Sequence, residues 1–139
     1  MIILDTNVVS ELMKPTPNVK VSAWTDAQIQ DELFICSPTV FEIEFGIRRL
    51  PDGDLKSALQ RSWERIWGER FADHCIPITC NGGRQASIIR AQAVLDREPT
   101  DLVDTLIAGA AAERKAKVAT RNTRHFPKFG LAVIDPWTA

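Results

Sequence analysis

The sequence predicts an α/β fold with a mainly parallel central sheet. Short apolar runs of strand length alternate along the chain with segments in which apolar residues recur at helical spacing. The 139 residues are enough to bury one hydrophobic core, and no linker, internal repeat or low-complexity tract divides them. We therefore expect a single domain over residues 1–139.

The chain opens with a short buried strand. Ile2–Leu4 is an apolar run that ends at Asp5, after which Thr6 or Asn7 is expected to cap a helix. The apolar positions of that helix are Val8, Val9, Leu12 and Met13. Two prolines then end it, and a second helix is expected over residues 21–29.

The second predicted strand, Leu33–Cys36, leads directly into a helix. Ser37 is expected to cap this helix, with Pro38 in its first turn. Glu42 is expected in the first turn as well, away from the apolar face. That face consists of Val40, Phe41, Ile43, Ile47 and Leu50. After a turn, helical spacing resumes over residues 55–67.

The second half of the chain repeats the alternation. Past the glycine pair at 82–83, a helix is expected through residues 86–95. Thr100 or Asp101 then caps a helix that reaches Lys115 and is rich in small residues, so its backbone can pack closely on a sheet. Three short apolar segments complete the predicted sheet: residues 75–78, 117–120 and 132–134.

Composition excludes several classes of protein. Seventeen basic residues against 18 acidic ones leave a net charge of −1, so nucleic-acid binding would depend on a local basic patch. Three cysteines are too few for a disulfide framework or a cysteine-rich zinc site, which fits a reducing cytoplasm. No apolar run approaches the length of a membrane span, and Asp5 interrupts the opening run that an export signal would need.

Oxygen-bearing side chains fall at element ends that a parallel sheet gathers at its carboxyl edge. Asp5 ends the first strand, and Asn122 follows the strand at 117–120. Glu42 and Asp104 lie near the starts of two helices. Carboxylates brought together repel one another unless a cation compensates, and Mg²⁺ prefers oxygen ligands together with a substrate phosphate. The pattern indicates a metal site that acts on a phosphodiester.

Each acid also has a structural explanation when it is taken alone. Asp5 can start a turn or cap a helix. The helix dipole favours Glu42 and Asp104 in first turns of any protein, and Asp101 can be the cap that makes Asp104 an ordinary first-turn acid. Spacing alone does not decide between these explanations and a site.

The order of motifs resembles that of PIN-domain toxins of the VapC type, including the branch that resembles FitB. Residues 2–12, IILDTNVVSEL, resemble the opening of these proteins. The resemblance continues, in the family's order, through SPTVFEI at 37–43, FGI at 45–47, DTLIAG at 104–109, ATRNTR at 119–124 and DPW at 135–137.

This resemblance implies a three-layer α/β/α PIN-domain fold and an endoribonuclease that uses Mg²⁺ or Mn²⁺. The three core acids of the family fall on Asp5, Glu42 and Asp104. Thr6 matches a family hydroxyl near the metal. Asn122 takes the place of a fourth acid and adds no charge, which puts a second metal ion in question. His125 stands where many relatives carry aspartate, and we expect no catalytic role for it.

The resemblance also implies partners. The family's toxins act in the cytoplasm, pair as dimers and are silenced by a VapB-type antitoxin that covers a groove near the acids, so that DNA is reached only through the antitoxin. Basic side chains position nucleic-acid backbones, and the candidates here are Arg48, Arg49, Arg121, Arg124 and Lys128. Trp63 and Trp67 could stack on bases, but packing in the core or in a dimer is favoured.

Two other functions stay open. A phosphohydrolase of the haloacid-dehalogenase type would use Asp5 as its nucleophile, but it needs a second aspartate where this chain has Asn7. A PIN-like module without catalytic activity, which only binds RNA or an antitoxin, is the other alternative. The three core acids count against it, whereas Asn122 leaves it room.

Overall fold

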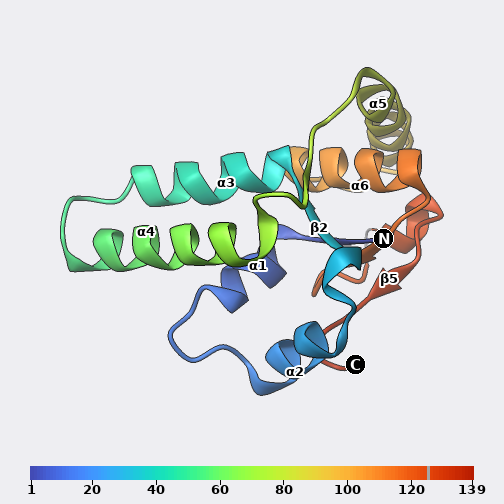
Figure 1. Ribbon diagram of the computed structural model, residues 1–139. Coiled ribbons are helices and arrows are strands. Elements are labelled where there is room, and N and C mark those ends of the chain that lie inside the picture. The colour runs from blue at the N-terminus through green and yellow to red at the C-terminus, as the bar shows by residue number, and fades with distance from the viewer. Residues whose placement is uncertain (125) are drawn as a thin grey trace.

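The computed structural model describes residues 1–124 and 126–139, and within them the chain forms a five-stranded parallel sheet with helices on both faces (Figure 1). The strand order is β3-β2-β1-β4-β5. The strands are β1 (Ile2–Leu4), β2 (Leu33–Cys36), β3 (Cys75–Ile76), β4 (Lys117–Ala119) and β5 (Val133–Ile134). β1 is the central strand, β2 and β3 follow on one side of it, and β4 and β5 are then added on its other side. The strand order therefore reverses between β1 and β4. Ligands of open parallel sheets bind at such a point.

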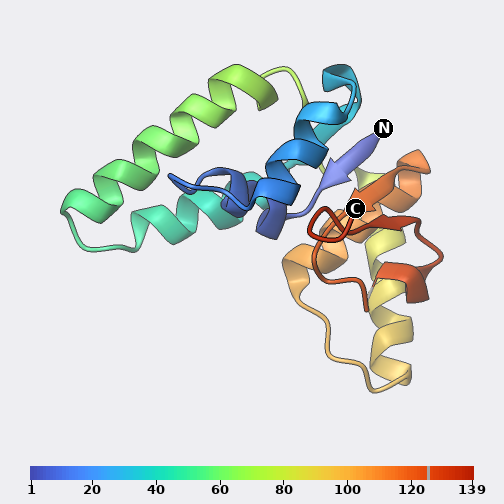
Figure 2. The same ribbon diagram turned by 90° about the horizontal axis from the view of Figure 1, so that it is seen from below.

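The described residues form six α-helices and three shorter helical segments. The α-helices are α1 (Thr6–Leu12), α2 (Val19–Ala27), α3 (Ser37–Arg48), α4 (Asp54–Ile66), α5 (Cys80–Leu95) and α6 (Leu102–Arg114). The 3₁₀ segments are η1 (Gln30–Glu32) and η3 (Phe126–Phe129), and a π-helical turn, η2 (Trp67–Phe71), extends α4. Both views show α3 and α4 projecting together to one side, with α5 at the other (Figures 1 and 2).

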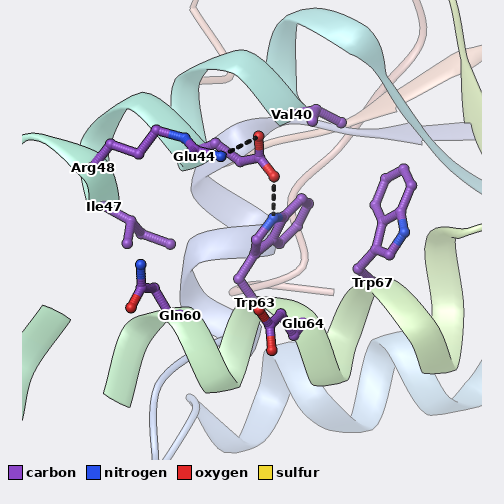
Figure 3. A pocket seen from close by; sticks show the side chains of 8 residues that line it. All are labelled: Val40, Glu44, Ile47, Arg48, Gln60, Trp63, Glu64 and Trp67. Carbon is purple, nitrogen blue, oxygen red and sulfur yellow. Dashed lines mark hydrogen bonds and ion pairs between the residues drawn. The ribbon is translucent and has the colours of Figure 1, made fainter. Parts of the chain in front are cut away.

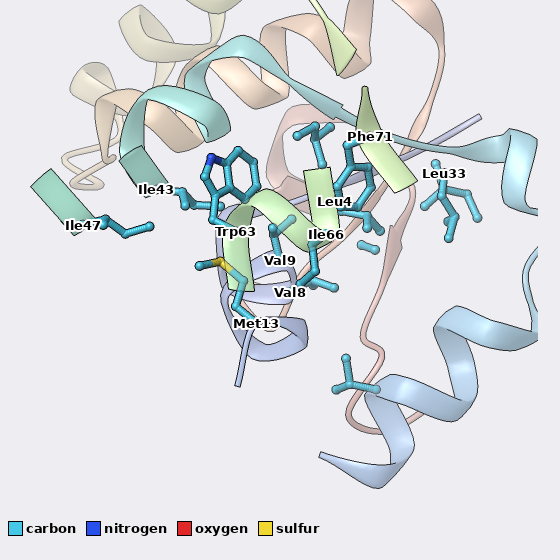
Figure 4. Close-up of a cluster of buried hydrophobic side chains, with 14 residues drawn as sticks. Leu4, Val8, Val9, Met13, Leu33, Ile43, Ile47, Trp63, Ile66 and Phe71 are labelled. Atoms are coloured by element: carbon cyan, nitrogen blue, oxygen red, sulfur yellow. The ribbon is translucent and has the colours of Figure 1, made fainter. Parts of the chain in front are cut away.

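Side chains of β1 point alternately to the two faces of the sheet, and this explains why a helical layer covers each face. Ile2 and Leu4 belong to one buried cluster, together with side chains of α1, α2, α3 and α4 (Figure 4). Ile3 points to the opposite face and belongs to a second cluster with Ile107 of α6 and Ile89 of α5. Successive side chains of a strand face opposite sides of a sheet, so a strand that is apolar at every position needs helices on both faces. The structure confirms the expected α/β/α layers.

A glycine contact fixes the distance between α5 and α6. A Cβ atom on Gly109 would lie 2.5 Å from the Gly82 carbonyl oxygen and 2.7 Å from the Ala86 Cβ, so only glycine permits this approach. The helix α5 begins at Cys80, where the Thr79 hydroxyl accepts a hydrogen bond from the Gly82 amide at 2.9 Å. The expectation that the glycine pair precedes this helix is therefore wrong. Both glycines lie inside the helix, and Gly82 is the one that contacts α6.

The helix starts also differ from several expectations. Asp5, and not Thr6 or Asn7, caps α1 by accepting a hydrogen bond from the Thr6 amide. Ser37 does not cap α3, since it is the first helical residue and its hydroxyl accepts a hydrogen bond from the Ile78 amide at 3.1 Å. Asp101 is the cap of α6, as one of the two alternatives predicted.

Two residues of α3 lie elsewhere than expected. Glu42 is the sixth residue of the helix and so lies in the second turn, not the first. Phe41 was expected on the buried apolar face, but it is 64% exposed and stacks on Phe45, which is 55% exposed. A large exposed aromatic pair is unusual on a monomer surface. Of the described helices, none combines the length and apolarity needed to cross a membrane.

Replacing Gly109 by alanine is expected to destabilise the protein by about 1–3 kcal/mol, because the added methyl group has no space between α5 and α6. Urea unfolding followed by circular dichroism measures the loss. The matched control is Gly46→Ala in α3, where an added Cβ meets nothing within 4 Å. That change is expected to stabilise the helix by up to about 1 kcal/mol. Equal effects at both glycines would contradict the packing explanation.

Candidate functional site

Asp5 occupies the carboxyl end of the central strand β1 and is 2% exposed. Its backbone amide continues the sheet by donating to the Ala119 carbonyl at 2.9 Å. Its Oδ1 accepts a hydrogen bond from the Thr6 amide at 2.7 Å. Its Oδ2 accepts from the Thr120 hydroxyl at 2.7 Å and from the Asn7 side-chain amide at 2.9 Å. Three donors therefore hold this carboxylate in one orientation.

Sequence reasoning missed Thr120 and Asn7 as parts of this site. The register pairs Leu4 with Ala119, so the residues that follow them, Asp5 and Thr120, lie side by side where the two strands end. The sequence does contain a signal for Thr120, because the two apolar strand segments at 2–4 and 117–119 are each followed by a residue that can form hydrogen bonds. Without the strand order, nothing in the sequence showed that these two strands are neighbours.

Asp104 reaches the same region from α6. The capping carboxylate of Asp101 accepts hydrogen bonds from two amides of the first turn, at 2.9 and 3.2 Å. Burial, followed by the charges of Asp5, Asp101 and Glu42, raises the pKa of the Asp104 carboxyl to about 7, although a hydrogen bond from Asn122 opposes the rise. The high pKa therefore reflects first the partial burial of the carboxyl and then the neighbouring negative charges, both of which disfavour its charged form.

Glu42 is half-buried on α3 and completes the group of acids. Burial raises its pKa, as do the charges of Asp101 and Asp5, while a hydrogen bond with the Thr6 side chain lowers it. The Thr6 hydroxyl also lies within 3.4 Å of Thr39 Oγ1. One hydroxyl proton cannot serve both acceptors, and the charged carboxylate is the stronger acceptor. Thr6, the first residue of α1, can therefore orient the Glu42 carboxylate.

A cavity of about 140 Å³ opens beside Asp104. Its lining includes Asp101, Asn122 and the aromatic residue Phe126. A water molecule occupies about 30 Å³ of liquid, so the cavity has room for a small hydrated ion. Asp101, which sequence reasoning treated only as a helix cap, thus lines the same space as Asp104 and adds a further negative charge.

The donor chemistry of this site suits a hard divalent cation. Asp5, Glu42, Asp104 and Asp101 offer carboxylate oxygens, which are the ligands that such a cation prefers. Burial, together with the charges of neighbouring acids, raises the pKa of the first three, and a bound cation would favour their charged forms. In the conformation described for residues 1–124 and 126–139, no three histidine, cysteine, aspartate or glutamate side chains are close enough to enclose a metal ion. The acids interact electrostatically without forming a closed ligand cage.

The candidate basic residues have different surroundings. Arg121 and Arg124 are exposed, and Arg121 lies over the Trp137 ring at 5.3 Å from its centroid. Arg48 lies 3.9 Å from Glu44, and Lys128 is paired with Glu98 at 2.6 Å. Arg49 is also exposed. His125, for which no catalytic role was expected, lies outside the described residues.

A separate pocket of about 190 Å³ lies between α3 and α4 (Figure 3). It contains none of the clustered acids of the sheet edge. Trp63 is 6% exposed and packs at 5.7 Å against Trp67, so packing is the role of this tryptophan, as favoured. The Trp63 indole donates to Glu44 at 3.2 Å across the pocket. The remaining lining residues include Val40, Ile47, Arg48, Gln60 and Glu64.

Comparison with known proteins gives consistent matches over the whole chain. The PIN domain family matches residues 2–130. VapC ribonuclease Y4jK of Sinorhizobium fredii is 36% identical over 137 residues, 99% of this chain and 98% of the relative. Toxin FitB of Neisseria gonorrhoeae is 34% identical over 99% of both chains. The structure of FitAB bound to an IR36 DNA fragment superposes with a TM-score of 0.87, at 34% identity over 99% of this chain and 96% of the other.

The raised pKa of Asp104 predicts how stability depends on pH. Between about pH 4 and pH 7 the folded protein keeps a proton that an unfolded aspartate has lost, so the free energy of unfolding falls as pH rises. Asp104→Asn removes this loss and is expected to stabilise the metal-free protein at about pH 8 by about 1 kcal/mol, a value reduced because the carboxyl is only partly buried.

Thermal unfolding in EDTA at about pH 5 and about pH 8 measures this difference. The gain is expected to shrink at the lower pH, where the wild-type carboxyl is already protonated. Asp73→Asn, a change at an exposed aspartate outside the site, is the control and should show no such pH dependence. A gain for Asp104→Asn that is equal at both pH values would contradict the assigned cause.

Proposed function

The chain belongs to the PIN-domain family of VapC-type ribonucleases and toxins, and from this premise we propose that it is the toxin of a type II toxin–antitoxin pair. The proposed activity is a Mg²⁺- or Mn²⁺-dependent endoribonuclease, carried by a single PIN domain over residues 1–139 and acting in the cytoplasm. The observation that supports the proposal is that burial and the charges of neighbouring acids raise the pKa of Asp5, Glu42 and Asp104, so these three carboxyls influence one another electrostatically.

We propose Asp5 and Asp104 as the principal metal ligands. The three hydrogen bonds to Asp5 fix the orientation of its carboxylate. Asp104 lies in the first turn of α6, and the Asn122 side chain forms a hydrogen bond with its carboxylate. Glu42 serves as a further ligand or orients the attacking water, with Thr6 holding it. When bound, the divalent ion would lower the pKa of a water molecule and neutralise charge on the leaving oxygen.

The hydrogen bonds of Asp5 also argue against the dehalogenase alternative. In that mechanism Asp5 would attack a phosphorus atom, and a second acid would stand at residue 7. Here Asn7 donates to Asp5 Oδ2, which also accepts from Thr120. Residue 7 is thus a hydrogen-bond donor to Asp5, and the second acid of that mechanism is missing. Among the described residues, Asp5 Oδ1 accepts only the hydrogen bond from the Thr6 amide, so it keeps a lone pair that a cation can use.

The alternative of a catalytically weak or inactive binding module rests on Asn122. An amide at this position accepts or donates a hydrogen bond but adds no charge, so the site has three core acids rather than four. Asp101 restores a carboxylate to the same cavity. We therefore favour the active enzyme, and cleavage compared with RNA binding in the same preparation separates the two proposals.

The pocket between α3 and α4 suits a segment of an antitoxin. Its apolar lining of Trp63, Trp67 and Ile47 can take an aliphatic or aromatic anchor, and Glu64 can pair with a basic residue beside it. Helix-in-groove recognition uses such anchors. The solved FitAB complex with a DNA fragment supports a partner of this kind, through which DNA would be reached indirectly.

The exposed face of α3 and α6 suits a second copy of the chain. Phe41 and Phe45 are stacked with ring centroids 5.8 Å apart. Beside them an open hollow of about 330 Å³ has an almost wholly apolar lining that includes Pro38, Ile78, Leu102, Val103 and Leu106. Exposed apolar surface of this kind marks association sites on soluble proteins. We propose a homodimer through this face.

Asp104→Asn is expected to reduce cleavage of a fluorescent RNA at least about a hundredfold in the presence of Mn²⁺, because a principal ligand is lost. The fold should remain, as judged by circular dichroism. Millimolar Mn²⁺ should raise the unfolding temperature of the wild-type protein by a few degrees and that of the variant by much less. Asp73→Asn, the matched control, should cleave at the wild-type rate. If Asp104→Asn also cleaves at the wild-type rate, the assignment of Asp104 as a metal ligand is wrong.

Phe45→Ser is expected to shift the protein from dimer to monomer at low micromolar concentration, since a polar side chain replaces an apolar contact at the proposed interface. Light scattering after size exclusion measures the mass. Val94→Ser is the control, because Val94 is 70% exposed on α5, away from this face. If both variants keep the wild-type mass, or if the wild type is itself monomeric, the proposed interface is wrong.

A further inference from the structure

The backbone of Arg121 is fixed by two residues that donate hydrogen bonds to Asp5, namely Thr120 and Asn7. Arg121 directly follows Thr120, whose hydroxyl donates to Asp5 Oδ2. Its own amide donates to Asn7 Oδ1 at 3.3 Å, and the side-chain amide of Asn7 donates to the same carboxylate oxygen. The start of the Arg121 side chain is thus fixed next to the acidic site, at the edge where β4 ends.

The guanidinium group of Arg121 is held by the ring of Trp137. The Arg121 Cζ lies 5.3 Å from the ring centroid, within the range of a cation–π interaction. Trp137 is itself well fixed, since it is half-buried against the core cluster of β1 and α1. Its amide donates to Asp135 Oδ1 at 2.9 Å, and the following Ala139 amide closes the turn on the Asp135 carbonyl at 2.9 Å.

The charge of Arg121 is available for a ligand. The side chain is exposed, and within the part of the chain that the structure describes it forms no salt bridge. The charge of Arg121 is among the smaller causes that lower the pKa of the Glu11 carboxyl, but the oxygens of that carboxylate accept from Lys14 at 2.7 Å and from the Asn18 amide at 2.8 Å. Arg48 and Lys128, by contrast, face acids of their own at 3.9 and 2.6 Å.

An acidic site that acts on a polyanion needs a cation beside it. The carboxylates of Asp5, Glu42 and Asp104 repel the phosphates that flank the reacting one, so a fixed positive charge next to them lowers the cost of binding the strand. Arginine suits this task because its planar group donates two parallel hydrogen bonds to a phosphate. A ring stacked on one face of the guanidinium leaves its edge free and limits its rotation.

We propose that Arg121 binds a backbone phosphate of the RNA strand next to the phosphate at the acidic site, and that Trp137 is the residue that positions it. This inference rests on the proposed ribonuclease function and adds a substrate contact to it. It selects one arginine from the candidates and gives the C-terminal segment Asp135-Pro136-Trp137 a role in substrate binding. The contact is to the backbone, so it is independent of base sequence.

Binding of a fluorescent single-stranded RNA in EDTA, where cleavage is absent, tests the phosphate contact. Arg121→Ala is expected to weaken binding about fivefold to tenfold and to reduce the dependence of log affinity on log salt by about 0.7, the value for one phosphate contact to a single strand. Arg90→Ala is the control, because Arg90 is an exposed arginine on α5 away from the site. Equal losses for both variants would refute a specific contact.

The role of Trp137 is tested by a double-mutant cycle. Trp137→Ala is expected to weaken binding about threefold, Trp137→Phe to retain most of it, and the double variant with Arg121→Ala to bind no worse than Arg121→Ala alone. In cleavage assays with Mn²⁺ the KM should rise in each single alanine variant while kcat changes little. Additive losses in the double variant, or no loss on Trp137→Ala, would overturn the positioning role.

Other outcomes separate this inference from the proposed function. If the wild-type protein cleaves RNA but Arg121→Ala keeps the wild-type affinity, KM and salt dependence, the phosphate contact is wrong and the ribonuclease remains. If the wild-type protein neither binds nor cleaves RNA with Mn²⁺, both fall together. Unfolding temperatures of all variants are measured alongside, and a loss of binding for Trp137→Ala that Trp137→Phe does not restore counts against stacking.

Discussion

The three hydrogen bonds to the carboxylate of Asp5 depend on the whole architecture of the sheet. Two of the donors, Thr6 and Asn7, lie in the first turn of the helix that Asp5 itself caps. The third, Thr120, comes from β4, the parallel neighbour of β1, and reaches Asp5 because Leu4 pairs with Ala119. A slip of one residue in this register would turn either side chain to the other face of the sheet. Strand pairing thus determines the geometry of the site.

The other acids are brought to Asp5 by helices from the two layers. Asp104 lies on α6, whose distance from α5 is set by the contact between Gly82 and Gly109. Glu42 lies on α3, which follows the adjacent strand β2. Packing therefore forces together carboxylates that repel one another, and burial raises the pKa of each. Such an arrangement costs stability in the absence of a cation, which is characteristic of sites kept for function.

Much of the fold was predictable because its signals are local. Apolar runs identified β1 and β2 with their observed bounds, and Asp101 was one of the two caps considered for α6. The positions of Gly82 and Thr120 were not predictable in this way. Gly82 looks like a helix breaker until α6 is known to pack against it, and the importance of Thr120 depends on which strand lies beside β1. Local motifs and a family resemblance predict the three acids as site residues, whereas the charge that Asp101 adds beside them is evident only from the coordinates.

The strand order has a consequence for synthesis of the protein. The central strand β1 is made before the other four described strands, and β4, which Thr120 follows, lies more than a hundred residues further along the chain. Chains emerge from the ribosome N-terminus first. During translation Asp5 therefore lacks one of its donors, and the Arg121–Trp137 pair does not yet exist. An unfinished polypeptide that lacks β4 therefore carries all three acids but cannot form the hydrogen bond from Thr120 that completes the orientation of the Asp5 carboxylate.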